Sequence, residues 1–139
     1  MSAFWDASAV VPLCIDQPGA SEAVRLLEAG SPVVWWATAV EATSGIVRSR
    51  LSDPQILAAG LERLRSLREE WREIEPSERV REIALDNLRR FDLRSADAMQ
   101  LAAALVWAEE RPAGHRFVCN DRRLSDAARS LGFDVVSFY

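Results

Sequence analysis

The sequence predicts an α/β domain in which a small parallel sheet is doubly wound, with helices on both faces. Short apolar runs, such as 32–36, alternate along the chain with longer segments of helical periodicity. These runs are apolar throughout, as expected of parallel strands that are buried on both faces. There is no internal repeat, low-complexity segment or linker, so we expect residues 1–139 to form one domain.

The expected strands are short and apolar, and lie at 2–5, 32–36, 116–119 and 134–138. The second strand ends in two tryptophans, and successive strand residues point to opposite faces. One of Trp35 and Trp36 therefore belongs to the core, and the other to the core or to an interface. Packing is favoured over base stacking for both, because aromatic side chains are most often packing elements.

Helix boundaries follow from start and stop signals. Ser52-Asp53-Pro54 supplies a capping residue and a proline at the first helical position. Gly30 and Gly132 follow helical segments and are expected to end them, while Gly45 is a candidate kink. The expected helices are a brief one around 10–14, then 20–29, 38–50, a long one from 54 that breaks at 75–77, one that starts at Ser77, and finally 95–110 and 124–131.

The long helix from residue 54 carries an apolar stripe at spacings of three and four, formed by Leu57, Leu61, Leu64, Leu67 and Trp71. We interpret this stripe as a packing surface.

Composition excludes several kinds of chemistry. The net charge is −4, so there is no general basic surface for nucleic acid. All 17 basic residues are arginine, which removes mechanisms that need a catalytic lysine. Cys14, Cys119 and His115 match no zinc-ligand spacing, so a bound metal would be held by oxygen. No apolar run reaches membrane-spanning length and no secretion signal is visible, so we expect a cytoplasmic protein without membrane contact.

Four acidic residues fall where they can reach the carboxyl edge of the sheet, the edge at which doubly wound folds bind ligands. Asp6 follows the first strand, and Asp121 follows the third. Glu41 lies near the start of the helix after the second strand. Asp97 lies in the first turn of the most apolar helix.

Each acid also has a purely structural interpretation. Asp6 and Asp121 are suitable helix caps, Asp97 suits a helix N-terminus, and Glu41 could be solvated. Together they are harder to explain in this way, because two carboxylates about 4 Å apart repel by about 4 kcal/mol at an effective dielectric near 20. Magnesium or manganese, which prefer oxygen ligands, would relieve this repulsion.

The acids lie in segments that resemble the PIN-domain nucleases, and most closely the VapC-type toxins of toxin–antitoxin modules. The matching segments are FWDASAVV, WWATAVEATSGI, LRSADAMQLAAAL and FVCNDRRLSDAARSLGF, in the order and spacing of the family. SADAMQLAAA is the most specific part. Together they cover the chain end to end, and the resemblance implies a PIN-like version of the small Rossmann-like sheet described above.

The resemblance implies that Asp6, Glu41, Asp97 and Asp121 bind magnesium, or manganese, and catalyse hydrolysis of RNA phosphodiester bonds. Asp121 would bind a second ion or orient the attacking water. Ser8 would hydrogen-bond within the site. The resemblance also implies a toxin that inhibits translation and growth, a VapB-like antitoxin encoded by a separate gene, and a homodimer.

This chain departs from many relatives at Cys119, where they carry Thr or Ser two residues before the last acid. A thiol is a poor hydrogen-bond donor. We therefore expect the support near Asp121 to be weaker, or to come from Asn120. Arg94, Arg122 and Arg123 lie close to the acids in sequence and are candidate contacts to RNA phosphates, although they could equally be solvated.

Two other magnesium-dependent classes fit less well. A phosphoacceptor receiver domain needs paired acids after the first strand and a lysine. A haloacid-dehalogenase-type phosphatase needs a second aspartate where Ser8 stands, and also a lysine. The remaining alternative is a non-catalytic PIN-fold module that binds RNA or protein. All four acids are present despite their cost to stability, which favours catalysis.

Overall fold

The computed structural model describes residues 2–49 and 53–139, and its centre is a five-stranded sheet with the order β3-β2-β1-β4-β5. All neighbouring strands are parallel. The strands are β1 (Ala3–Trp5), β2 (Pro32–Trp35), β3 (Arg72–Ile74), β4 (Arg116–Val118) and β5 (Asp134–Val136). The chain builds outward from β1 on one side and then on the other, so the predicted doubly wound α/β class is confirmed.

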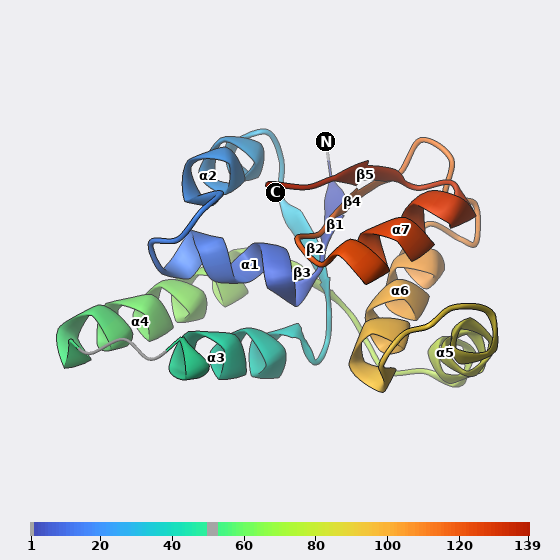
Figure 1. Cartoon of the computed structure of the whole chain (residues 1–139), viewed down its shortest axis with the longest axis horizontal. Coiled ribbons are helices and arrows are strands. Elements are labelled where there is room, and N and C mark those ends of the chain that lie inside the picture. Colours follow the sequence, from blue (N-terminus) through green and yellow to red (C-terminus); the bar gives the residue numbers. More distant parts are fainter. Residues whose placement is uncertain (1, 50–52) are drawn as a thin grey trace.

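Helices cover both faces of this sheet (Figure 1). One layer contains α1 (Ala7–Cys14), α2 (Ala20–Glu28), α3 (Thr38–Arg48) and α4 (Pro54–Glu70); the other contains α5 (Glu78–Arg90), α6 (Ser95–Trp107) and α7 (Arg122–Leu131). Among the described residues, no helix is both long enough and apolar enough to span a membrane.

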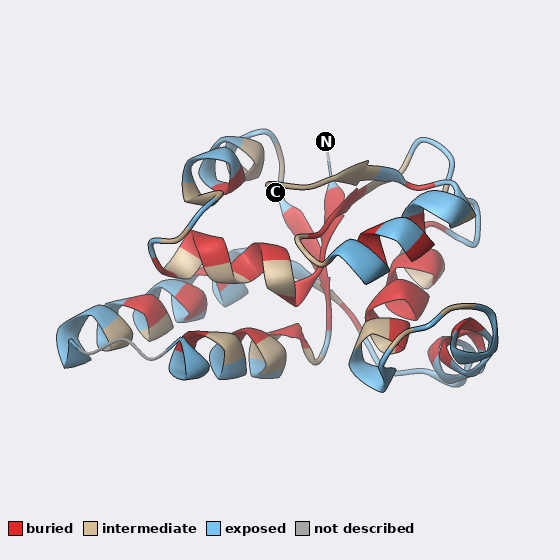
Figure 2. Ribbon diagram, in the orientation of Figure 1, coloured by how far each residue is buried: buried red, intermediate tan, exposed pale blue. Residues whose placement is uncertain are grey.

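Successive side chains of each strand point to opposite faces of the sheet, which divides the core into two halves. Phe4 points to the α5–α7 side, where it stacks on Phe117 with ring centroids 5.6 Å apart. Its neighbour Trp5 points to the α1–α4 side and packs with Val34 and Val118. Buried residues line the sheet and the inward faces of the helices, while α2, α4 and α5 expose their outer faces (Figure 2). The sheet is thus fixed from both sides.

Strand β3 was not predicted. The apolar spacing that runs to Trp71 suggested a helix up to residue 75, but α4 ends at Glu70 and Trp71 is already extended. The strand is only three residues long, and it carries Arg72 and Glu73 because it lies at the sheet edge. A short, polar edge strand has no periodicity that distinguishes it from the last turn of a helix.

Most predicted helix boundaries agree with the structure. Asp53 caps α4 by accepting a hydrogen bond from the Gln55 amide at 2.8 Å, and Pro54 is its first residue. Gly132 ends α7 with a φ of 109°. Gly30 follows the last residues of α2 but is not among the glycines with positive φ. The parts of these predictions that concern residues 50 and 52 lie outside the described residues.

Helix α3 is continuous through Gly45, where the sequence suggested a kink. This glycine allows α1 to approach closely, because a Cβ at position 45 would lie 3.0 Å from the Cγ2 atom of Val11. The contact fixes α3, which carries Glu41, against α1, which begins next to Asp6.

Candidate functional site

The carboxyl ends of β1 and β4 lie side by side at the point where the strand order reverses, and each is followed by an aspartate. Asp6 comes directly after β1 and remains attached to the sheet, because its N–H donates to the Val118 carbonyl at 2.9 Å. Asp121 follows β4 and is the N-terminal cap of α7. Doubly wound sheets bind ligands at such a position, so this edge is the candidate site.

Asp6 combines the two roles that the sequence left as alternatives, a helix cap and a place in the site. Its side chain caps α1 and is only 3% exposed. The Oδ2 atom accepts hydrogen bonds from the Ser8 amide at 3.1 Å and the Ser8 hydroxyl at 2.5 Å. Burial raises the pKa of Asp6, bonds from Ser8 and Cys119 oppose this shift, and the Asp121 charge adds to it.

Cys119 lies between the two aspartates. Its sulfur is 3.6 Å from Asp6 Oδ2 and accepts a hydrogen bond from the Asp121 amide at 3.4 Å. Burial, with a further contribution from the Asp6 charge, raises the pKa of the Cys119 thiol to about 12. The thiol is therefore protonated and adds no negative charge between the carboxylates.

Asn120 makes contacts that the sequence did not suggest. Its N–H donates to the Ser8 hydroxyl at 2.9 Å, and its side-chain oxygen accepts from the Phe138 amide at 2.8 Å. The Asp121 carboxylate instead accepts from the Leu124 amide at 2.9 Å, within its own helix. Asn120 thus connects Ser8 to the C-terminal segment, and α7 itself orients Asp121.

Glu41 reaches the site from the first turn of α3 and is partly buried. Its Oε2 atom accepts a hydrogen bond from the Gln100 side-chain amide at 3.1 Å. Burial, together with the charges of Asp6 and Asp97, raises the pKa of Glu41 to about 7, although the Gln100 bond opposes this shift.

Asp97 reaches the site from the first turn of α6. Burial raises its pKa to about 6, with further contributions from the charges of Asp6 and Asp121, while Arg94 partly offsets them. The sequence alone therefore located four carboxylates that the fold brings within electrostatic range of one another.

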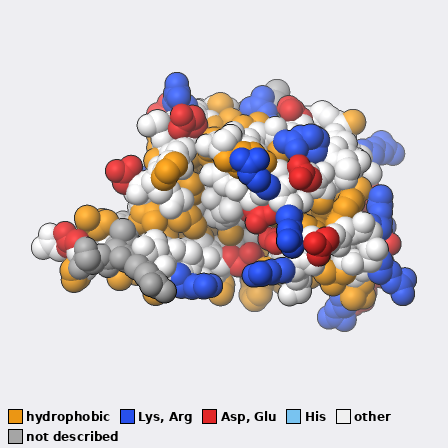
Figure 3. Space-filling view, in the orientation of Figure 1, with side chains coloured by type: hydrophobic (Ala, Val, Ile, Leu, Met, Phe, Trp, Pro, Cys, Tyr) orange, Lys and Arg blue, Asp and Glu red, His pale blue; other side chains and the backbone are white. Residues whose placement is uncertain are grey.

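The acids gather in one place but do not form a closed ligand cage. On the face shown in Figure 3, acidic side chains group in the depression between the two helical layers, with arginines around them. Within residues 2–49 and 53–139, no three His, Cys, Asp or Glu side chains stand close enough to hold a metal ion. The donors are nevertheless hard oxygen atoms whose mutual repulsion a divalent cation would reduce, so they fit magnesium or manganese chemically.

The three candidate arginines make different contacts, and only Arg94 is shown to act on one of the acids. Arg94 lies near enough to lower the pKa of Asp97. The Arg122 guanidinium lies 4.3 Å over the ring of Tyr139. Arg123 pairs with Asp92 at 3.3 Å, and both side chains are well exposed. Such exposed contacts are weak, so these arginines remain available to a ligand.

Gln100 is a functional candidate that the sequence analysis missed. It is fully buried in α6, and its amide nitrogen donates to the Thr38 hydroxyl at 3.0 Å as well as to Glu41. Its side-chain oxygen is buried and has no hydrogen-bond partner among the residues that the structure describes. A signal was present, because Gln100 lies three residues after Asp97 in a helix that is otherwise apolar.

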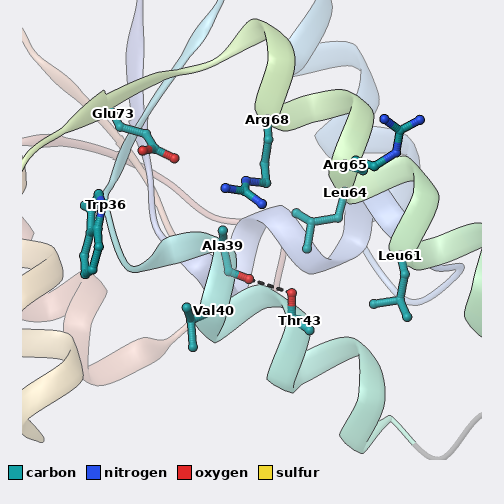
Figure 4. Close-up of a pocket in the computed structure, with 9 residues that line it drawn as sticks. All are labelled: Trp36, Ala39, Val40, Thr43, Leu61, Leu64, Arg65, Arg68 and Glu73. Carbon is teal, nitrogen blue, oxygen red and sulfur yellow. Dashed lines mark hydrogen bonds between the residues drawn. The ribbon is translucent and has the colours of Figure 1, made fainter.

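A separate groove of about 480 Å³ lies between α3 and α4. Trp36, Ala39 and Val40 line one side, and Leu61, Leu64 and Arg68 come from α4 (Figure 4). Val40 is 70% exposed and Trp36 is 51% exposed. Apolar side chains as exposed as these commonly mark a surface for a partner.

Residues 3–130 match the PIN domain family, and the chain therefore belongs to that family. The match covers all four acids at the sheet edge and, among the described residues, the helices of both layers except the last residue of α7. No curated protein sequence matches the chain.

Solved structures share the fold at low sequence identity. A toxin–antitoxin complex from Klebsiella pneumoniae is 18% identical, with a TM-score of 0.69 and coverage of 99% of this chain and 98% of that one. FitAcB from Neisseria gonorrhoeae is 17% identical, with a TM-score of 0.66 and coverage of 99% and 97%. VapBC2 from Rickettsia felis, bound to a DNA fragment from its promoter, is 12% identical, with a TM-score of 0.66 and coverage of 99% and 100%.

Asp97→Asn should stabilise the metal-free protein at pH 8. The folded pKa of Asp97 is raised from 3.8 to about 6, so stability that is present below pH 3.8 is lost as the pH rises through 6. The neutral amide avoids this loss. The expected gain in the free energy of unfolding is about 1 kcal/mol, after allowance for solvent screening of a half-exposed group. Melting curves in EDTA should show a Tm several degrees above that of the wild type.

The gain should shrink as the pH is lowered from 7 to 4. Asp16→Asn, at an exposed aspartate in the α1–α2 connection, is the matched control and should leave Tm nearly unchanged. An Asp97→Asn protein that melts below the wild type at pH 8 would contradict the repulsion described here.

Gln100→Leu should destabilise the protein by about 1–3 kcal/mol at pH 8, because it leaves the Glu41 oxygen and the Thr38 hydroxyl without this partner. The free energy of unfolding from urea titration measures the effect. Gln55→Leu, at an exposed position of α4, is the control and should change it little. Equal values for wild type and Gln100→Leu would mean that the buried amide contributes no net stability.

Proposed function

We propose that this protein is a metal-dependent endoribonuclease, and that it acts as the toxin of a toxin–antitoxin pair, inhibiting translation and growth by cutting RNA. The observation that carries the proposal is the meeting of Asp6, Glu41, Asp97 and Asp121 at the reversal of strand order. These acids come from four separate segments, and the raised pKa values of Asp6, Glu41 and Asp97 indicate a cost to the metal-free fold. Structural roles alone give no reason to accept that cost.

Asp6, Glu41 and Asp97 would hold magnesium or manganese. Such an ion, when bound, neutralises charge on a phosphate oxygen and lowers the pKa of a coordinated water. The carboxylates would have to move closer together to hold the ion, since the described side chains form no group of three ligands as they stand.

The remaining residues of the site would orient these groups. Ser8 holds the Asp6 carboxylate through two hydrogen bonds, and Gln100 holds that of Glu41. Asp121, fixed by the first turn of α7, would orient the attacking water. Arg94, together with Arg122 and Arg123, would contact phosphates on either side of the cut.

Asp6→Ala and Asp97→Asn should each lower magnesium-dependent cleavage of a panel of structured RNAs by at least about 100-fold. Each removes a charge that the proposed metal site needs. Gel analysis with magnesium, with manganese and with EDTA gives the rates, and Asp16→Asn should cleave like the wild type.

Equal cleavage by the wild type and both variants would remove this mechanism. If metal-loaded protein without antitoxin cuts none of the RNAs, the alternative of a non-catalytic PIN-fold module that binds RNA or protein is favoured instead.

The groove between α3 and α4 is the surface we propose for the antitoxin. The similarity in fold to chains of toxin–antitoxin structures supports such a partner. Exposed apolar side chains in the groove, Val40 and Trp36 above all, would bury against an apolar segment of a VapB-like protein. Val47 and Ile56, about half exposed elsewhere on α3 and α4, are available for the proposed homodimer.

Val40→Asp should weaken binding of the antitoxin encoded by the adjacent gene by about 10- to 100-fold, because a charge would be buried without a partner. Titration calorimetry with the purified pair measures this. Leu85→Asp, at a 59% exposed position of α5, is the control. Unchanged affinity in Val40→Asp would exclude the groove while leaving the nuclease proposal intact.

A further inference from the structure

Trp36 is an exposed tryptophan in a fixed position. It follows β2 directly, and its N–H donates to the Ile74 carbonyl of β3 at 3.1 Å. Its neighbour Trp35 is 4% exposed and packs in the core, whereas Trp36 is 51% exposed. Trp35 is therefore the core residue of the pair, and Trp36 is the one for which the sequence left an interface as an alternative to the core. A half-exposed indole whose backbone is fixed to the sheet is a suitable surface for a flat ligand.

A second hollow, of about 440 Å³, lies beside Trp36. Its wall is mostly apolar and includes Met99 and Ala96 from α6. Glu41 also lines it, and Ala96 directly precedes Asp97. One of the four acids, Glu41, therefore borders this hollow directly, so a ligand in it would adjoin a ligand at the acidic site.

We propose that this hollow binds one unpaired nucleobase of the RNA substrate, stacked against the indole of Trp36 next to the phosphate that is cut. The inference rests on the proposed nuclease function and specifies its substrate. A phosphodiester held at the acids necessarily brings its own nucleosides beside Glu41. The hollow offers them a mostly apolar wall, while the Glu41 carboxylate at its border disfavours phosphates and other anions.

Stacking on an aromatic side chain accepts any base, because every base has a π face. Stacking on Trp36 requires, however, that the base is not stacked on the adjacent bases of its own strand. The substrate is therefore single-stranded at this nucleotide, as in a loop or bulge of a folded RNA. The subsite selects RNA by local structure more than by sequence.

Binding of a short single-stranded 2′-O-methyl oligoribonucleotide tests the subsite directly. Calcium is the only divalent ion present, and a gel confirms that the strand stays intact. Trp36→Ala should weaken binding about tenfold or more, and Trp36→Phe should restore most of the affinity because it keeps an aromatic face. Leu85→Ala, at an exposed apolar position of α5, should bind like the wild type. Equal affinity of wild type and Trp36→Ala overturns the proposal.

Kinetics with an RNA that the wild type cuts provide the second test. Trp36→Ala should raise KM about tenfold with little change in kcat, as expected for lost binding of a base that does not react. An abasic nucleotide next to the cut should impose the same loss on the wild type and no further loss on Trp36→Ala. Additive losses overturn the proposal, because they place the base elsewhere.

The two proposals fail separately. Cleavage that is abolished by Asp6→Ala but unaffected by Trp36→Ala refutes the subsite and leaves the nuclease function. Binding that depends on Trp36 without any cleavage by the wild type refutes hydrolysis and leaves the subsite. If Trp36→Ala weakens only the antitoxin and neither RNA measurement, this face is a protein contact and the subsite is refuted.

Discussion

The buried carboxylate of Asp6 is the constraint on which the rest of this structure depends. A charge that is 3% exposed is tolerated only with close compensation. Two hydrogen bonds from Ser8 and the N-terminus of α1 provide part of it, and the other acids act against it. The close contact of α1 with α3 at Gly45, and the packing of Trp5 beneath the site, hold these opposing groups in place.

The other acids at the sheet edge are also placed at the N-terminal ends of helices. Asp6 and Asp121 cap helices, and Glu41 and Asp97 lie in first turns, so each of the four acids stands at the N-terminal end of a different helix. The N-terminal ends of these helices face the site from both layers, and their partial positive charge favours carboxylates. The doubly wound topology therefore supplies some of the compensation that the absent lysines would otherwise have to provide.

Much of this could be predicted from the sequence, because apolar runs and capping residues are local signals. The acids were located from their positions after strands and at helix starts. Three features depend on contacts between distant segments and left no local signal of comparable strength. Edge strand β3 is too short and too polar to be recognised as a strand. Gln100 acquires its role only when α6 packs against α3. The two-residue periodicity of a strand predicts that Trp35 and Trp36 point to opposite sides, but not which one faces solvent.

Cys119 has a consequence for the redox behaviour of the protein. Thiolates, rather than thiols, react with oxidants and with disulfides. Because its thiol is buried and its pKa is raised to about 12, Cys119 has almost no thiolate at neutral pH. Burial beside Asp6 thus disfavours oxidation of this thiol, and a sulfinic or sulfonic acid at that position would add a negative charge next to the carboxylates.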